Sequence, residues 1–229
     1  MKATMKMLAA ALAILMALGL AGAMADGRTA MVGEKLTFGR YEQDGNDENG
    51  PEGIEWQVVD VNGGRALLVS VKGLESMPYH AEKRAVTWKN CTSRSWLNNA
   101  FLYSAFTGEE REAILLTKVS NATWDGNVKW DTTNGAHTQD RVFLLSYSEV
   151  ERYFPNSRHR QIEPSVHVSS EDPKTRVDDG AWWWLRSAGH TQQGAAVVRA
   201  DGTMGQSRTV NNPHGMIRPA MWVQVDRLP

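Results

Sequence analysis

Cysteine is almost absent from this 229-residue chain, in which Cys91 is the only one. A single cysteine excludes an internal disulfide, so the fold must be held together by a hydrophobic core. An unpaired cysteine is most often a small packed hydrophobe, and we therefore expect Cys91 to be buried. A reactive thiol is the alternative.

The chain also lacks an excess of either charge and the common catalytic motifs. It holds 25 lysines and arginines against 26 acidic residues and has no basic run, which gives no electrostatic basis for nucleic-acid binding. No G-x-S-x-G, H-E-x-x-H or phosphate-loop motif occurs. The six histidines are scattered singly through polar stretches, so no metal centre is predicted from them. A transition metal shared by His159 and His167 is the alternative.

A long apolar run occurs only near the start of the chain. Two lysines precede an apolar stretch over residues 7–20, and small residues follow at positions 23 and 25. This pattern predicts a secretory signal peptide over residues 1–25, because the run is short for a membrane span. An uncleaved anchor is the alternative. Cleavage would leave a single domain, residues 26–229, without a membrane span, in a secreted, periplasmic or cell-surface location.

The strongest structural signal is a run of three tryptophans, at positions 182–184, within the apolar segment 181–187. Each indole can bury about 150–250 Å² of mostly apolar surface. Neighbouring residues on a strand face opposite ways, so such a strand needs cover on both faces. The segment 215–223 is similarly apolar, and we expect the two segments to be neighbours in one sheet.

Each of these segments carries one arginine, Arg186 or Arg218. A buried guanidinium requires a partner, so we expect an ion pair or bonds to backbone carbonyls that lock the central strands. A clamp for an anion or carboxylate at the mouth of a site is the alternative. The predicted structural core comprises Trp182, Trp183, Trp184, Arg186, Arg218 and Trp222.

Local signals place turns and short helices along the rest of the chain. Two hairpins are indicated by Asn62-Gly63-Gly64 and by Asp201-Gly202, each between apolar runs. Two capping boxes, Thr107 with Glu110 and Ser146 with Glu149, predict helix starts. The expected strands are 35–41, 56–60, 65–70, 142–145, 195–200 and 217–225, and the expected helices lie around 92–102, 109–116 and 146–154.

Polar stretches at 121–139, 158–179 and 206–214 are predicted to be irregular loops, and long loops on a compact domain are usually functional or disordered. The loop 44–50 mixes Asp and Asn with glycine, which is the composition of calcium-binding turns. Its spacing does not complete a D-x-[DN]-x-[DN]-G loop, so a solvated turn is favoured. Calcium remains possible, with Asp44, Asn46 and Asp47 as candidate ligands, and no other cofactor is predicted.

Several motifs occur together in the order typical of one family. They are Phe38-Gly39-Arg40-Tyr41-Glu42-Gln43, Glu55-Trp56, Val86-Thr87-Trp88, Trp96-Leu97-Asn98-Asn99, Val142-Phe143-Leu144-Leu145-Ser146, Trp183-Trp184-Leu185-Arg186-Ser187 and Ile217-Arg218-Pro219-Ala220. Over about residues 33–226 the chain resembles an uncharacterised domain of exported bacterial proteins. That domain is distantly similar to the C-type-lectin-like fold of formylglycine-generating enzymes and of retroelement-diversified receptor proteins.

The resemblance implies an α+β, C-type-lectin-like fold with small twisted, mostly antiparallel sheets, short helices and long ligand-facing loops. It carries no established activity. Formylglycine-generating enzymes need an active-site cysteine pair, which one cysteine cannot supply. Calcium-type lectins commonly carry Glu-Pro-Asn and Trp-Asn-Asp triplets; here Glu163-Pro164-Ser165 is a partial match and the second triplet is absent.

These observations favour an extracytoplasmic binding module that recognises a glycan or an extracellular protein through the loops 121–139 and 206–214. Aromatic side chains dominate binding hot spots, although tryptophans can instead pin a loop to the core. The rival hypotheses are an enzyme of unknown reaction, with a deep pocket and perturbed acids or histidines, and a structural envelope protein with a large apolar patch. The candidate ligand-binding residues are Trp124, Trp130, Arg208, Asn211, Asn212 and His214.

Overall fold

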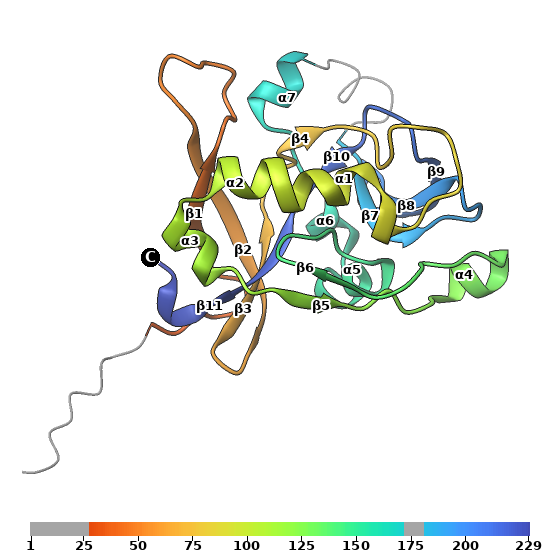
Figure 1. The fold of residues 1–229 in the computed structure, drawn as a ribbon, viewed down its shortest axis with the longest axis horizontal. Helices are drawn as coiled ribbons and strands as arrows, with labels where there is room; N and C mark the ends of the chain where they lie inside the picture. Colours follow the sequence, from red (N-terminus) through yellow and green to blue (C-terminus); the bar gives the residue numbers. More distant parts are fainter. Residues whose placement is uncertain (1–27, 172–180) are drawn as a thin grey trace, which may run out of the picture.

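The computed structural model describes residues 28–171 and 181–229. The predicted signal peptide and the end of the polar stretch 158–179 lie outside the described residues. Short helices and mostly antiparallel strands alternate along the chain, so the fold is α+β (Figure 1). Within the described ranges, every helix is too short or too polar to cross a bilayer.

The first sheet is four-stranded and antiparallel throughout. Its order is β1 (Lys35–Tyr41), β2 (Glu52–Asn62), β3 (Arg65–Ser70) and β11 (Ala220–Gln224). The predicted hairpin between β2 and β3 is confirmed, because Asn62 pairs with Arg65 across a turn formed by Gly63 and Gly64. The φ angles of these glycines are 58° and 74°, and two consecutive positive φ angles give a turn whose twist matches that of the strands.

The second sheet has five strands and contains the tryptophan run. Its order is β4 (Glu75–Ser76), β10 (Met216–Ile217), β7 (Trp183–Ala188), β8 (Gly194–Val198) and β9 (Met204–Thr209). Strand β10 runs parallel to β7 with Met216 opposite Trp183, which confirms that the two apolar segments are neighbours. All residues of β7 and β8 are buried, as expected for strands covered on both faces. The second predicted hairpin joins β8 to β9.

The prediction of one strand over residues 217–225 is wrong. Strands β10 and β11 belong to different sheets, and Arg218 and Pro219 connect them. Proline lacks an N–H and fixes φ, so it does not fit inside a central strand. The Pro219 carbonyl instead accepts a hydrogen bond from the Ser70 amide (3.0 Å). On β11, Trp222 is half-buried at the edge of the core, with the Arg65 guanidinium 5.6 Å from its ring centroid.

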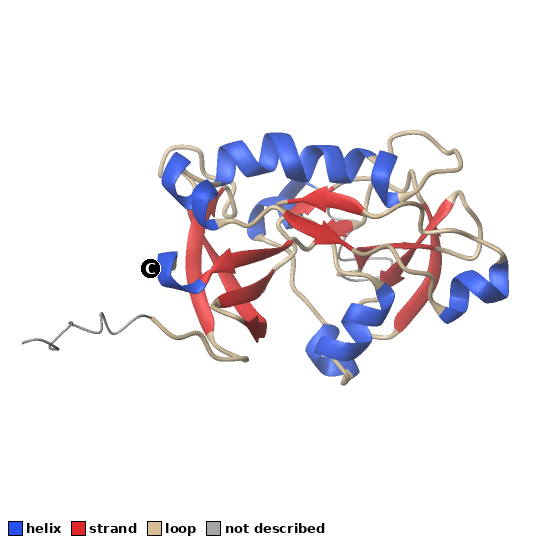
Figure 2. Ribbon diagram, turned by 60° about the horizontal axis from the view of Figure 1, so that its bottom comes forward, coloured by secondary structure: helices blue, strands red, loops and turns tan. Residues whose placement is uncertain are grey.

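Helices lie over both sheets. Helix α1 (Thr92–Trp96), the π-helical turn η2 (Leu97–Phe101) and α2 (Leu102–Ala105) form one rod that extends from the five-stranded sheet to the four-stranded sheet (Figure 2). Helices α3 (Gly108–Ala113) and α5 (Tyr147–Tyr153) each begin with the predicted capping box. Helix α3 ends earlier than predicted, because Ile114 is extended and forms a β-bridge with Val223.

All three stretches predicted as irregular contain regular structure, and one predicted strand does not form. The remaining elements are η1 (Trp88–Asn90), β5 (Thr117–Val119), α4 (Asp125–Trp130), β6 (Thr138–Asp140), α6 (Ser157–Arg160), α7 (Val166–Glu171) and η3 (Val225–Arg227). Thus α4 and part of β6 lie in the stretch 121–139, and β6 pairs with β5. Most of α6 and all of α7 lie in the stretch 158–179, and β9 extends into the stretch 206–214. Residues 142–145 are buried as expected, but only Phe143 forms a bridge, to Ala220.

One cluster of buried apolar side chains includes residues of both sheets and of the helices. Cys91 belongs to this cluster, with 2% of its surface exposed. Burial raises the pKa of its thiol to about 11, so the thiolate is disfavoured. The expectation that Cys91 is a packed hydrophobe is therefore confirmed.

Candidate functional site

Arg186 is held by a closed set of partners inside the protein. Its guanidinium binds both carboxylate oxygens of Glu149, the Asn121 amide oxygen, and the carbonyls of Leu144 (2.8 Å) and Ser120 (2.8 Å). Burial alone would raise the pKa of the Glu149 carboxyl, but the charge and hydrogen bonds of Arg186 and the Ser146 donors together lower it. These contacts favour the structural ion pair over an anion clamp.

Arg218 is buried without any carboxylate partner among the described residues. Its Nε donates to the Ser70 carbonyl (2.9 Å), and its guanidinium lies between the rings of Phe154 (4.8 Å) and Trp183 (4.9 Å). Its Nη1 has no hydrogen-bond partner within the described structure. Burial lowers the pKa of Arg218 to about 9. Two aromatic faces stabilise this charge, and its 3% exposure leaves no access for a ligand.

Trp124, predicted to bind ligand, is a packed residue with 8% of its surface exposed. Its ring stacks on that of Tyr147, with centroids 3.9 Å apart and an interplanar angle of 17°. Gly126 leaves room for this ring, since a Cβ there would lie 2.0 Å from it. The Asn127 side chain accepts a hydrogen bond from the Trp124 amide and so helps to start α4. Trp124 therefore pins α4 to α5, which is the alternative stated for it above.

A polar cavity lies beside the β8–β9 hairpin, and we call it the His190 cavity. Its volume is about 260 Å³, and it is lined by His190, Thr191, Gly194, Ser207, Arg208, Thr209 and Asn212. The Trp130 ring meets the His190 ring edge-on, with centroids 5.8 Å apart, and 38% of Trp130 is exposed. The Arg208 guanidinium lies 4.4 Å from the centroid of the Trp182 ring, which positions it in the wall.

The structure thus brings together three of the predicted ligand-binding residues: Trp130, through His190, with Arg208 and Asn212. It does not place Asn211 or His214 in the cavity wall, and the His214 backbone amide instead donates to the Asn212 side chain (3.0 Å). Sequence reasoning missed His190 and Thr191. They lie in the connection between β7 and β8, so recognition of that strand pair would have placed them beside the loop 206–214.

A second cavity, of about 370 Å³, lies between α4 and α5 and is called the Trp124 cavity. It is lined by Thr123, Trp124, Asp125, Gly126, Lys129, Tyr147, Ser148, Glu151 and Gln206. This cavity is lined by both predicted ligand-facing stretches, because Lys129 belongs to the stretch 121–139 and Gln206 to the stretch 206–214. On β9, Gln206 is followed directly by Ser207 of the His190 cavity. The two cavities therefore occupy neighbouring positions at the end of the molecule that carries α4.

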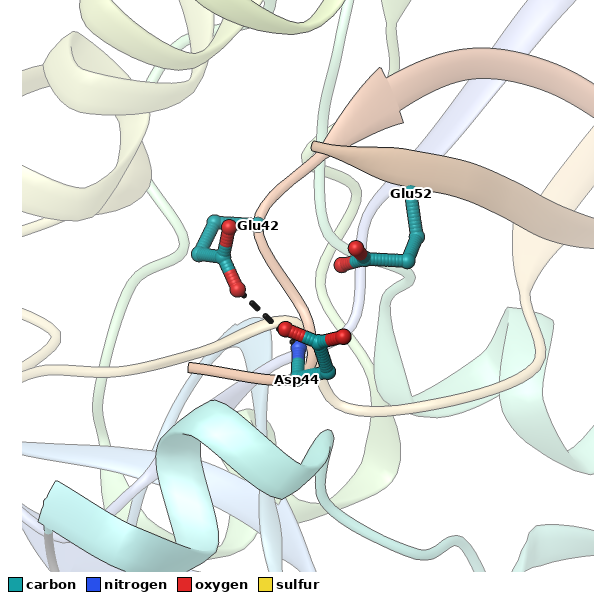
Figure 3. Close-up of side chains that lie close together, drawn as sticks. All are labelled: Glu42, Asp44 and Glu52. Atoms are coloured by element: carbon teal, nitrogen blue, oxygen red, sulfur yellow. Dashed lines mark hydrogen bonds between the residues drawn. The ribbon is translucent and has the colours of Figure 1, made fainter. Parts of the chain in front are cut away.

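The loop proposed for calcium places a different set of carboxylates together. Oxygens of Glu42, Asp44 and Glu52 lie within 4.8 Å of one another, whereas Asn46 and Asp47 are not members of the group (Figure 3). Hard cations bind such oxygens. However, Glu42 already accepts from the Asp44 amide, Asp44 from the Asn46 amide, and Glu52 from the Gln43 amide. Hydrogen bonds from Asn49 and the Asn46 amide lower the pKa of Asp44, so these contacts also explain the arrangement without a cation.

Two larger cavities have charged groups that are already paired. One, of about 740 Å³, contains Arg28 and Arg65, which contact Glu34 and the Trp222 ring respectively. The other, of about 750 Å³, lies between α3 and residues 226–229, where Arg227 pairs with Glu112 and Glu110 caps α3. Arg28, Arg65, Arg227 and Glu110 are thus already engaged by the protein.

A comparison with protein families matches residues 63–225 to a domain of unknown function, DUF6273. The chain belongs to this family. The DUF6273 match begins in the turn between β2 and β3, so β1 and all of β2 precede it although they complete the first sheet. Comparison with curated proteins and with solved structures gave no match.

The His190 cavity of this DUF6273 protein is open and polar. Most residues that line the His190 cavity are exposed or half-buried, so the cavity is a surface hollow. Its lining contains no carboxylate and one histidine, His190. Where burial does lower a histidine pKa, at His80, the ring contacts Arg84 and Thr92 in a packed region outside both cavities. The hollow can recognise a polar ligand through hydroxyl, amide and guanidinium groups.

Proposed function

We propose that this chain is an extracytoplasmic bacterial binding module of C-type-lectin-like architecture that recognises a glycan at the His190 cavity. The observation that carries the proposal is that Arg208 and Asn212 line this one hollow together with His190, whose ring contacts that of Trp130. The motif resemblance, the two small sheets and the short helices support the architecture. The basic and apolar pattern of residues 1–25 supports export.

Carbohydrate recognition follows from the chemistry of the lining. Thr191, Ser207, Thr209 and Asn212 offer hydroxyl and amide groups that both donate and accept hydrogen bonds, which matches the hydroxyl groups of a sugar. The exposed part of Trp130, which contacts His190, offers an aromatic surface beside the cavity. With no carboxylate in the wall, the site binds its ligand without calcium. A protein ligand is the alternative occupant.

Replacing Trp130 with alanine is expected to weaken glycan binding at least tenfold, because the rim loses its aromatic surface. Stability should change by less than about 0.5 kcal/mol, as for other exposed side chains. The measurement is binding of purified protein to an immobilised panel of gluco-, galacto- and manno-configured oligosaccharides, with and without a calcium chelator.

Tyr103→Ala is the matched control, since Tyr103 is an aromatic residue of α2 that is 66% exposed and lies outside both cavities. It should bind the panel like the wild type. If Trp130→Ala bound equally well, or if the folded wild type bound no member of the panel, glycan recognition at this hollow would be wrong.

If the chain is exported, the mature protein should have a defined N-terminus. When the full chain is produced in a bacterium, the extracytoplasmic product should begin at Asp26, and Ala25→Lys should block this cleavage because the peptidase requires a small residue there. Intact-mass analysis of fractionated cells distinguishes the two forms. A full-length wild-type product retained in the cytoplasm would contradict the proposal.

A further inference from the structure

The Trp124 cavity combines an aromatic wall with a set of unused polar groups. The stacked rings of Trp124 and Tyr147 form one wall, between the start of α4 and the start of α5. In the described structure, no hydrogen bond or ion pair engages the side chains of the polar lining residues, which are Thr123, Asp125, Lys129, Tyr147, Ser148, Glu151 and Gln206. The carboxylates around Asp44 differ in this respect, because backbone amides occupy them.

The charged groups of this cavity favour a cationic ligand. Asp125 of α4 and Glu151 of α5 are both exposed, and neither carboxylate has a counter-charge in the described structure. The single lining cation, Lys129, places its Nζ 4.7 Å from the centroid of the Trp130 ring and pairs with neither carboxylate. The lining itself therefore holds two carboxylates and one ammonium, and the carboxylates attract a cation. Arg160 and Arg199 lie outside the lining, although their charges also act on the Tyr147 hydroxyl.

The remaining polar atoms of the cavity could form hydrogen bonds with the hydroxyl groups of a ligand. The indole N–H of Trp124 is buried and has no acceptor within the described residues. A buried donor without an acceptor is unfavourable, and a ligand oxygen that reached it would satisfy it. Thr123, Ser148 and Gln206 add further donors and acceptors to the same lining.

We propose that the Trp124 cavity is a second binding site, separate from the His190 cavity, for a cationic carbohydrate of the amino-sugar class. Its ammonium group lies between Asp125 and Glu151, its ring packs on the aromatic wall, and its hydroxyl groups meet the neutral polar side chains. A neutral sugar leaves both carboxylates without a counter-charge, and a simple amine leaves the hydroxyl and amide groups unmet. An amino sugar satisfies both sets.

The test is an NMR titration of the full chain at pH 6, where the amino group of glucosamine is charged. Glucosamine is compared with N-acetylglucosamine and glucose, which lack that charge. Glucosamine should bind at least tenfold more tightly than either and should shift the indole N–H signal of Trp124, identified by its loss in Trp124→Phe. Equal dissociation constants for the three sugars, or shifts confined to other tryptophans, would overturn the proposal.

Charge-removing variants locate the site. Asp125→Asn combined with Glu151→Gln should weaken glucosamine binding at least tenfold and leave the melting temperature unchanged, because both residues are exposed and unpaired. Asp47→Asn combined with Glu48→Gln is the matched control on a distant exposed loop and should bind like the wild type. Unchanged affinity in the first variant would overturn the assignment. Trp130→Ala should keep glucosamine binding, which separates this site from the proposed glycan site.

Discussion

Replacing Glu149 with glutamine is expected to lower the free energy of unfolding by about 3 kcal/mol, measured by urea denaturation at pH 7. The change leaves the Arg186 guanidinium, which is 2% exposed, without its counter-charge. Glutamine still offers an oxygen to the Ser146 amide, so the capping box is kept and the loss reports on the charge. Arg186→Met in the same chain should recover part of the loss, because it removes the uncompensated charge.

Glu110→Gln is the matched control for this experiment. Glu110 occupies the same capping position in α3, where it accepts hydrogen bonds from the Thr107 and Gly39 amides and has no arginine partner among the described residues. Its replacement should cost less than about 1 kcal/mol. Equal losses at Glu110 and Glu149 would show that capping, and not the ion pair, carries the stability.

The pH dependence of the same variant has a definite sign. The pKa of Glu149 is lower in the folded protein than in the unfolded chain, so the unfolded chain binds more protons as the pH falls. The stabilisation from this carboxylate is complete above the unfolded pKa of about 4.3 and is lost as the pH falls through the folded value. The difference between wild type and Glu149→Gln should therefore shrink from pH 7 to pH 3.

Trp183→Ala is expected to cost about 4–5 kcal/mol, or to prevent folding, because it opens a cavity in the core. Trp183 is fully buried and donates its indole N–H to the Arg160 carbonyl (3.0 Å). The loss also removes one of the two rings beside Arg218, which is charged at pH 7 because its pKa is about 9. Trp183→Phe keeps an aromatic face and loses the hydrogen bond, so it should cost only about 1–2 kcal/mol.

Two comparisons separate these contributions in urea denaturation. In an Arg218→Met background, Trp183→Ala should cost about 0.5–2 kcal/mol less than in the wild type, the size of a cation–π contact. Trp130→Ala is the same substitution at an exposed tryptophan and should change stability by less than about 0.5 kcal/mol. A Trp183→Phe loss as large as that of Trp183→Ala would contradict a role for the ring.

The features predicted correctly from the sequence depend on residues close together in the chain or on the burial of strongly apolar segments. Ser146 and Glu149 are three residues apart, and the turn at Gly63 and Gly64 joins adjacent strands, so local chemistry is sufficient to predict both. The pairing of the tryptophan strand with β10 followed from the need to cover both of its faces. These inferences needed no knowledge of distant contacts.

The features that were missed depend on partners far apart in the sequence. Trp124 lies in a polar stretch that suggested exposure, but Tyr147 covers its ring and Gly126 leaves room for it. Pro219 lies within the strand expected over residues 217–225, but only the pairing of β10 with β7 and of β11 with β3, in different sheets, shows that the chain changes sheets there. Of the predicted ligand-binding residues, Arg208 does line the His190 cavity, because β9 carries it next to β8. The His190 side chain joins it there because His190 lies in the connection that leads into β8.

The passage of the chain through Arg218 and Pro219 has a mechanical consequence. Ser70, the last residue of β3, donates its amide to Pro219 and accepts from Arg218, so the junction is fastened on both sides. Movement of the five-stranded sheet away from the four-stranded sheet would have to break these two hydrogen bonds. A ligand bound at the end of the molecule that carries α4 should therefore also slow the unfolding of β1, at the opposite end.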